Sequence, residues 1–109
     1  MESLKKNSEF QTVYRGGKSL ANRYLVMYVL KNGSEKNRVG ISVSKKVGNS
    51  VIRHRITRLI RESYRLNEEK FATGYDFVVI SRVTAKGKGY SEIESALLHL
   101  GRMNGICEK

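Results

Sequence analysis

Three stretches rich in hydrophobic residues are predicted to be β-strands, in which successive side chains point to opposite faces. The stretches span residues 24–30, 38–44 and 75–81. In the second stretch Val39, Ile41 and Val43 share one face, with Gly40 on the other. A shorter strand is expected at residues 18–21. The run Asn32-Gly33-Ser34 predicts a turn from which the chain returns as the second long strand.

Helical periodicity predicts three helices, over residues 8–15, from 50 to about 66, and from 91 onward. Ser8 and Gln11 have capping-box spacing, and Gly16-Gly17 ends the first helix. Gly48-Asn49 suits a left-handed turn before the second helix. The apolar arcs of the second and third helices are expected to face the sheet, and they comprise Ile52, Ile56, Leu59, Ile60, Ser63 and Leu66, then Ile93, Leu97, Leu98 and Leu100.

The order of these elements predicts the fold class. Helix, strands, helix, strand and helix follow one another with no repeat and no domain boundary, so we expect an α/β sandwich around one mixed sheet. A chain of 109 residues with 39% hydrophobic and 28% charged residues fits one globular domain, residues 1–109. No apolar run approaches the ~20 residues of a membrane span, and the first residues do not resemble a signal peptide. Cys107 is the single cysteine, which excludes an internal disulfide, and we expect a cytoplasmic protein without a membrane partner.

Positive charge is concentrated in one segment. The chain carries a net charge of +11, and residues 45–65 contribute seven cations against one acid, Glu62. On the second helix the arginines fill the arc opposite the apolar one, with Arg55 near its edge. Arginine offers planar donors that match phosphate oxygens and can stack on bases. Since nearby acids are too few to neutralise this face, it is better explained as a nucleic-acid surface than as a solvated charged face.

The same segment resembles a known family. Gly48-Asn49-Ser50-Val51 followed by residues 53–62 (Arg-His-Arg-Ile-Thr-Arg-Leu-Ile-Arg-Glu) is similar to the signature of the bacterial ribonuclease P protein component. The similarity extends through residues 10–14, 19–23, 39–46 and 75–80, in the same order, and so covers nearly the whole chain. The family commonly has Arg-Asn-Arg where this chain has Arg53-His54-Arg55, and often has a basic residue where Ile52 and Thr57 stand.

This resemblance implies a two-layer αβββαβα fold of the ribosomal-protein-like RNA-binding kind, with a left-handed βαβ crossover through the arginine helix. It also implies an accessory subunit of a large catalytic RNA that removes the 5′ leader of precursor tRNA. The Mg²⁺ ions would be held by the RNA and its substrate, and no DNA partner is expected. The RNA subunit would be contacted by Lys45, Lys46, Asn49, Arg53, His54, Arg55, Arg58, Arg61 and Arg65. A cleft on the sheet would hold the leader, with Phe10, Tyr14, Asn22, Arg23, Tyr28 and Lys46.

Two other function classes, and one structural alternative, stay open on the residues alone. A self-sufficient nuclease would need convergent carboxylates or histidines, whereas His54 and His99 lie on separate helices and Asp76 is isolated in a strand. A ribosomal or other structured-RNA-binding protein would have the same composition. From their spacing of four residues alone, Phe10 and Tyr14 fit a hydrophobic core better than a cleft, and only the resemblance assigns them to the cleft.

Overall fold

The computed structural model describes residues 1–108 as one mixed α/β fold. Its strands are β1 (Glu2–Ser3), β2 (Lys18–Ala21), β3 (Leu25–Lys31), β4 (Arg38–Ser42) and β5 (Tyr75–Ser81). Its helices are α1 (Asn7–Gly16), α2 (Ser50–Leu66) and α3 (Tyr90–Met103), with 3₁₀ turns at Glu68–Lys70 and Val83–Ala85. The predicted order of elements is confirmed, with the short strand β1 added before it.

The five strands form one sheet in the order β1-β4-β5-β3-β2. Strand β5 runs parallel to β4 and antiparallel to β3, so that Phe77 lies opposite both Val39 and Val29. The turn at residues 32–34 therefore does not make a hairpin of β3 and β4, because β5 is inserted between them. This central position suits β5, because Phe77, Val78 and Val79 are all buried. A strand with apolar side chains on both faces is stable only where other elements cover both faces of the sheet.

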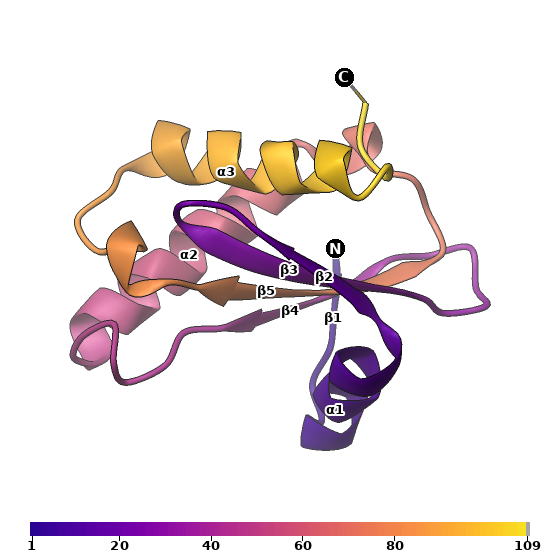
Figure 1. Ribbon diagram of the computed structural model, residues 1–109, viewed down its shortest axis with the longest axis horizontal. Coiled ribbons are helices and arrows are strands. Elements are labelled where there is room, and N and C mark those ends of the chain that lie inside the picture. Colours follow the sequence, from indigo (N-terminus) through magenta and orange to yellow (C-terminus); the bar gives the residue numbers. More distant parts are fainter. Residues whose placement is uncertain (109) are drawn as a thin grey trace.

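Helix α2 connects the parallel neighbours β4 and β5, which confirms the predicted crossover through the arginine-rich helix. Helices α2 and α3 lie together on one face of the sheet, while α1 lies on the other (Figure 1). The main core fills the space between the sheet and the α2–α3 layer. Its largest fully buried side chains include Leu25, Met27, Ile56, Ile60, Tyr64, Phe77, Ile93, Leu97 and Leu100.

The opposite face of the sheet is covered only at the position of α1. A second, smaller core forms there from Leu4, Val13 and Val78, with half-buried side chains of α1, β3 and β5 around it. Strand β1 pairs in parallel with β4 at the edge of the sheet and brings Leu4 into this core. A groove opens beside this small core, between α1 and β4.

Several local predictions were wrong in detail. Helix α1 is capped by Glu9, whose Oε1 accepts from the backbone N–H groups of Lys5 and Lys6 at 2.8 and 2.9 Å, and not by Ser8 with Gln11. Asn49 has an extended backbone (φ −70°) rather than a left-handed one, because it is the N-cap of α2. Near the end of α2, Tyr64 is buried and Leu66 is 51% exposed, so the helix turns Tyr64 toward the sheet in place of Leu66.

Candidate nucleic-acid interface

The basic face of α2 is directed away from the sheet. Ile56, Ile60, Ser63 and Tyr64 are the buried positions of this helix. With 100° between successive residues, His54, Arg58, Arg61 and Arg65 lie on the half of the helix opposite that buried arc, together with Val51 and Glu62, and the four basic side chains are exposed. The predicted separation of an apolar arc and a cationic arc is confirmed for Arg58, Arg61 and Arg65, but it is wrong for Arg53, which is half-buried on the side of the buried positions.

Arg58 and Arg61 on this face have no acidic partner among residues 1–108. Arg65 pairs with Glu62, with 2.6 Å between Nε and Oε1, whereas Arg58 and Arg61 form no ion pair with any carboxylate among residues 1–108. A cationic surface without compensating acids keeps a positive potential that attracts a polyanion.

The two arginines at the flanks of α2 have contacts within the fold. Arg53 is half-buried and its Nε donates to the carbonyl of Gly48 at 3.2 Å. Arg55 donates from Nη1 to the carbonyl of Lys88 at 3.0 Å, which connects α2 to the loop before α3. These two side chains therefore help hold local structure, whereas Arg58 and Arg61 do not.

The turn before α2 adds further positive charge. Lys45 and Lys46 are exposed there, and buried Val47 anchors the turn in the main core. The Asn49 side chain accepts from the backbone N–H of Ile52 at 3.0 Å, so this predicted RNA contact also caps the helix. The cap fixes where α2 starts, and it thereby fixes the direction of the arginine face relative to the two lysines.

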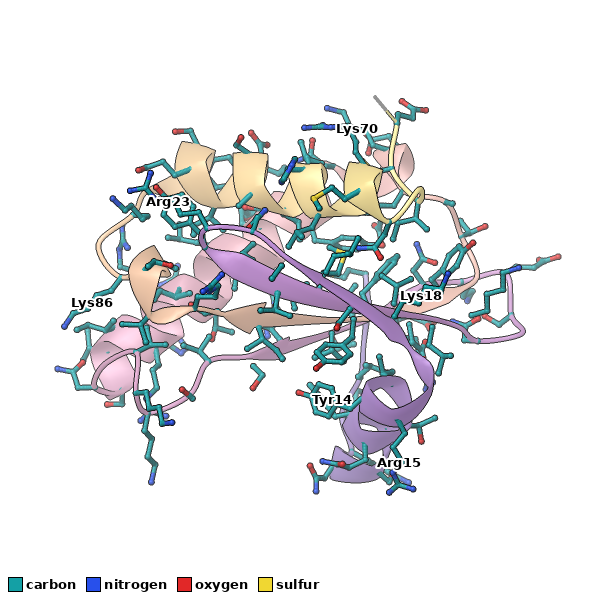
Figure 2. The ribbon with its side chains drawn as sticks, viewed as in Figure 1. Tyr14, Arg15, Lys18, Arg23, Lys70 and Lys86 are labelled. Atoms are coloured by element: carbon teal, nitrogen blue, oxygen red, sulfur yellow. The ribbon has the colours of Figure 1, made fainter. Side chains whose placement is uncertain are left out.

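A groove lies on the opposite face of the sheet, between α1 and β4. It has a volume of about 320 Å³ and is lined by Lys5, Asn7, Phe10, Tyr14, Ile41 and Ser42. Gly40 makes this close packing possible, because a Cβ atom at residue 40 would come within 2.6 Å of the Phe10 ring. Tyr28 of β3 packs edge-on against Tyr14, with ring centroids 5.0 Å apart and planes at 72°. Figure 2 shows Tyr14 between α1 and the sheet.

Phe10 and Tyr14 belong both to the smaller core and to the lining of the groove, and Tyr28 adjoins the groove through its contact with Tyr14. Phe10, Tyr14 and Tyr28 are each half-buried and pack against the core of Leu4, Val13 and Val78. Burial raises the pKa of Tyr14 above its ordinary value, so its hydroxyl stays protonated near neutral pH. The two alternatives weighed for Phe10 and Tyr14 are therefore compatible, since one edge of each side chain is packed while the other is accessible.

The sequence did not identify the polar rim of this groove. Lys5, Asn7 and Ser42 complete it, and no motif singled them out. The available signal was in β4, where Gly40 and Ser42 replace bulky residues on the face opposite Val39 and Ile41. Such a face indicates that another element, or a ligand, approaches the strand closely.

Asn22 and Arg23 do not lie in this groove, contrary to the expectation. They form the turn between β2 and β3 on the side of α3, where Asn22 Nδ2 donates to the carbonyl of Ala96 at 2.9 Å. Figure 2 shows Arg23 beside α3 and Tyr14 across the sheet from it. The expectation failed because it placed both residues on the aromatic face, whereas hydrogen bonds hold this turn against α3.

Asp76 is not isolated, as the sequence had suggested, but belongs to a charge cluster. Arg38 donates to its carboxylate from Nε (3.0 Å) and Nη2 (2.7 Å), and a third bond, from Nη1, reaches Glu9 at 2.8 Å. Asn32 Nδ2 also donates to Asp76, at 2.9 Å. These bonds tie α1 to β4 and β5 and account for this carboxylate as a structural group. Within residues 1–108, His, Cys, Asp and Glu side chains form no group of three or more able to hold a metal ion.

No helix among the described residues has both the length and the apolar character needed to cross a bilayer.

Comparison with known proteins gives a consistent result. The family described as Ribonuclease P matches residues 1–103. The chain is 62% identical to the ribonuclease P protein component of Lachnoclostridium phytofermentans, over 96% of this chain and 90% of the relative, and 57% identical to that of Alkaliphilus metalliredigens, over 91% and 89%. Among solved structures, the RNase P protein of Staphylococcus aureus superposes with a TM-score of 0.90 at 37% identity, covering 99% of both chains. That of Thermotoga maritima has a TM-score of 0.87 at 32% identity, covering 94% of this chain and 97% of the other.

Proposed function

This chain belongs to the ribonuclease P protein family, whose members are accessory subunits of an endoribonuclease, and we propose that its two surfaces divide the work of binding RNA. In this proposal α2 and the turn before it bind the RNA subunit, and the groove beneath α1 binds the 5′ leader of precursor tRNA. The complex works in the cytoplasm. No observation favours the alternative of a structured-RNA binder without a role in cleavage.

The observation that carries the proposal is the unpaired charge on α2. Arg58 and Arg61 project from a rigid helix, next to exposed His54, and without an acidic partner among residues 1–108. Their planar donors can contact two phosphate oxygens at once, which a lysine cannot do. Lys45, Lys46 and Arg65 extend the surface, while Asn49, Arg53 and Arg55 have roles in the fold in addition to any contact with RNA.

The groove has the composition of a site for single-stranded RNA. Phe10 and Tyr14 line it with aromatic rings, Tyr28 packs beside Tyr14, and every base has a face that can stack on such a ring. Lys5 supplies a cation at the rim, and Ser42 and Asn7 supply groups that form hydrogen bonds. Lys46 lies four residues beyond Ser42 and is exposed, so we assign it to the path between the groove and α2. This composition favours a leader bound with little preference for sequence.

The chemistry of cleavage is assigned to the RNA subunit. Among residues 1–108 the acids and histidines form no group of three or more that could hold a metal ion, and the buried carboxylate of Asp76 is paired with Arg38. We propose that Mg²⁺ is held by the RNA and the substrate, and that the protein contributes cations that reduce the repulsion between two polyanions.

Reconstitution with the cognate RNA subunit tests this proposal. The protein alone is expected not to cut precursor tRNA, and adding it to the RNA subunit should lower the Mg²⁺ concentration needed for cleavage, because protein cations replace part of the counterion screening. The measurement is the cleavage rate as a function of Mg²⁺ with and without protein. Site-specific 5′ cleavage by RNA-free protein would refute the assignment.

A change at Tyr28, which packs against Tyr14 beside the groove, tests the leader site. Tyr28→Ala is expected to weaken binding of precursor tRNA to the assembled complex by roughly 1–3 kcal/mol, since a stacked base loses its partner. Mature tRNA, which has no leader, should bind with nearly unchanged affinity. The measurement is the ratio of the two dissociation constants.

Two control variants separate stacking from stability. Tyr28→Phe keeps the ring and should keep the ratio of dissociation constants. Val13→Ala weakens the same small core at a side chain with no exposed surface, and it should lower the melting temperature without changing the ratio. If Tyr28→Ala behaves like Val13→Ala, with lower stability and an unchanged ratio, these rings belong to the core alone.

A further inference from the structure

Five hydrogen bonds that involve side chains hold the turn that carries Arg23 in place. Asn22 Oδ1 accepts from the backbone N–H of Tyr24 at 3.2 Å and of Leu25 at 3.0 Å, while its Nδ2 donates to the Ala96 carbonyl. Arg82 donates from Nη1 to the carbonyl of Asn22 at 2.8 Å, and the Thr84 hydroxyl donates to the carbonyl of Arg23. A turn held so firmly presents the residue at its tip in one position.

The side chain at this tip is a cation without an acidic partner. Arg23 is exposed and forms no ion pair with any described residue. Its guanidinium lies over the ring of Tyr24, with 5.5 Å between Cζ and the ring centroid, and the Lys88 ammonium lies 5.6 Å from the same centroid. Cation–π contacts therefore keep two positive charges together around one aromatic ring.

Beside this pair lies a hollow of about 480 Å³ between the turn and α3. It is lined by Asn22, Arg23, Tyr24, Ser91, Glu92, Ser95, Ala96 and His99. Asn22 Nδ2 is 3.2 Å from His99 Nδ1. Because the two backbone bonds to Asn22 Oδ1 fix the orientation of its amide, Nδ2 is the donor and His99 Nδ1 the acceptor, so Nε2 carries the ring proton. The hollow thus combines hydroxyls, a carboxylate and an imidazole donor with a cationic rim.

We propose that this hollow binds one unpaired nucleotide of RNA, with its phosphate at the rim formed by Arg23 and Lys88 and its base toward Ser95 and His99. The inference rests on the proposed role of the chain in an RNA complex, and it adds a third contact, on the side of the sheet opposite the leader groove. Glu92 Oε1 accepts from the backbone N–H of Gly89 at 2.9 Å, and the other oxygen of this carboxylate orients the nucleotide, since it repels a phosphate but accepts from the amino groups on base edges. The volume suits a small ligand site.

The nucleotide can come from the RNA subunit or from precursor tRNA, and binding measurements distinguish the two sources. Arg23→Gln should weaken binding roughly 5- to 150-fold, the loss expected when a stacked or charge-paired nucleotide is released. A loss in assembly with the RNA subunit identifies that RNA as the source. A loss confined to the binding of precursor tRNA by the assembled complex identifies the substrate. Arg23→Lys should recover only part of the affinity, because it keeps the charge but loses the planar donor.

A second variant tests the hollow without altering charge. Ser95 is exposed on α3, so Ser95→Trp can fill the hollow while the helix stays folded. Ser95→Trp should weaken the same interaction that Arg23→Gln weakens, either assembly with the RNA subunit or the binding of precursor tRNA. Its melting temperature should equal that of the wild type. The matched controls are Lys31→Gln, which removes one exposed cation at the far end of β3, and Ser34→Trp in the turn after it.

The inference is overturned if Arg23→Gln and Lys31→Gln weaken binding by the same factor, or if Ser95→Trp binds both RNAs like the wild type. Either result leaves the proposed function intact, because that function depends on wild-type assembly and on α2. Failure of the wild-type protein to bind the RNA subunit would instead refute the proposed function.

Discussion

Replacing both Arg58 and Arg61 with alanine is expected to weaken assembly with the RNA subunit by about 100-fold, or about 10-fold for each charge-assisted hydrogen-bonding side chain that is removed. The dependence of the association constant on salt should also become shallower, by about 0.7–0.9 log units for each phosphate that is no longer neutralised. The fold should survive, because both side chains are exposed and neither holds α2 to the sheet. Titrating the RNA subunit at several salt concentrations measures both quantities.

A control that removes the same amount of charge is available elsewhere in the chain. Lys18 and Lys31 are exposed on β2 and β3, which lie beyond β5 from β4, the strand that α2 contacts. Replacing both with alanine therefore removes two cations that are not on the arginine face. This variant should change the salt dependence much less. If the Arg58/Arg61 double variant is stable and keeps the wild-type slope, the arginine face is merely solvated.

Replacing Arg38 with methionine is expected to lower the free energy of unfolding by about 1–3 kcal/mol, because buried Asp76 would lose two of its hydrogen bonds while water reaches the site through the partly exposed position of Arg38. The Asp76 side chain is 6% exposed, and Arg38 supplies two of the three hydrogen bonds to its carboxylate. Such a decrease is a large fraction of the stability of a small domain. Denaturant unfolding followed by circular dichroism gives the change.

A double variant separates the charge from the packing. Adding Asp76→Asn to Arg38→Met removes the buried charge as well, so the double variant should be more stable than Arg38→Met alone. Asp76→Asn by itself should still support cleavage in the reconstituted complex if Asp76 is structural. Loss of cleavage in a folded Asp76→Asn protein would mean that this carboxylate takes part in the reaction.

The pairing of Arg38 with Asp76 could not be predicted from the sequence. The two residues are 38 positions apart, and only the parallel register of β4 and β5 places them opposite each other. The order of the strands has the same origin. The turn at residues 32–34 is a local signal, but whether β3 pairs with β4 or with β5 depends on which strand needs cover on both faces.

The positions of Asn22 and Arg23 were likewise decided by tertiary contacts. Their neighbours in sequence indicate a turn, yet the hydrogen bonds from Asn22 to Ala96 and from Arg82 to Asn22 set the side of the sheet to which it belongs. The accessibility of Phe10 follows in the same way from Gly40, a residue 30 positions away that allows α1 to approach the sheet.

What the sequence by itself determined was local and periodic. The limits of α2 at Ser50 and Leu66 and of β5 at Tyr75 and Ser81 were predicted as the structure has them, because repeats of 3.6 and 2 residues are encoded within each segment. The separation of arginines from apolar residues on α2 follows from the same geometry. The tertiary structure alone decided which cations stay unpaired, which carboxylates are neutralised and where a groove opens, because each of these depends on residues that meet only when the sheet is assembled.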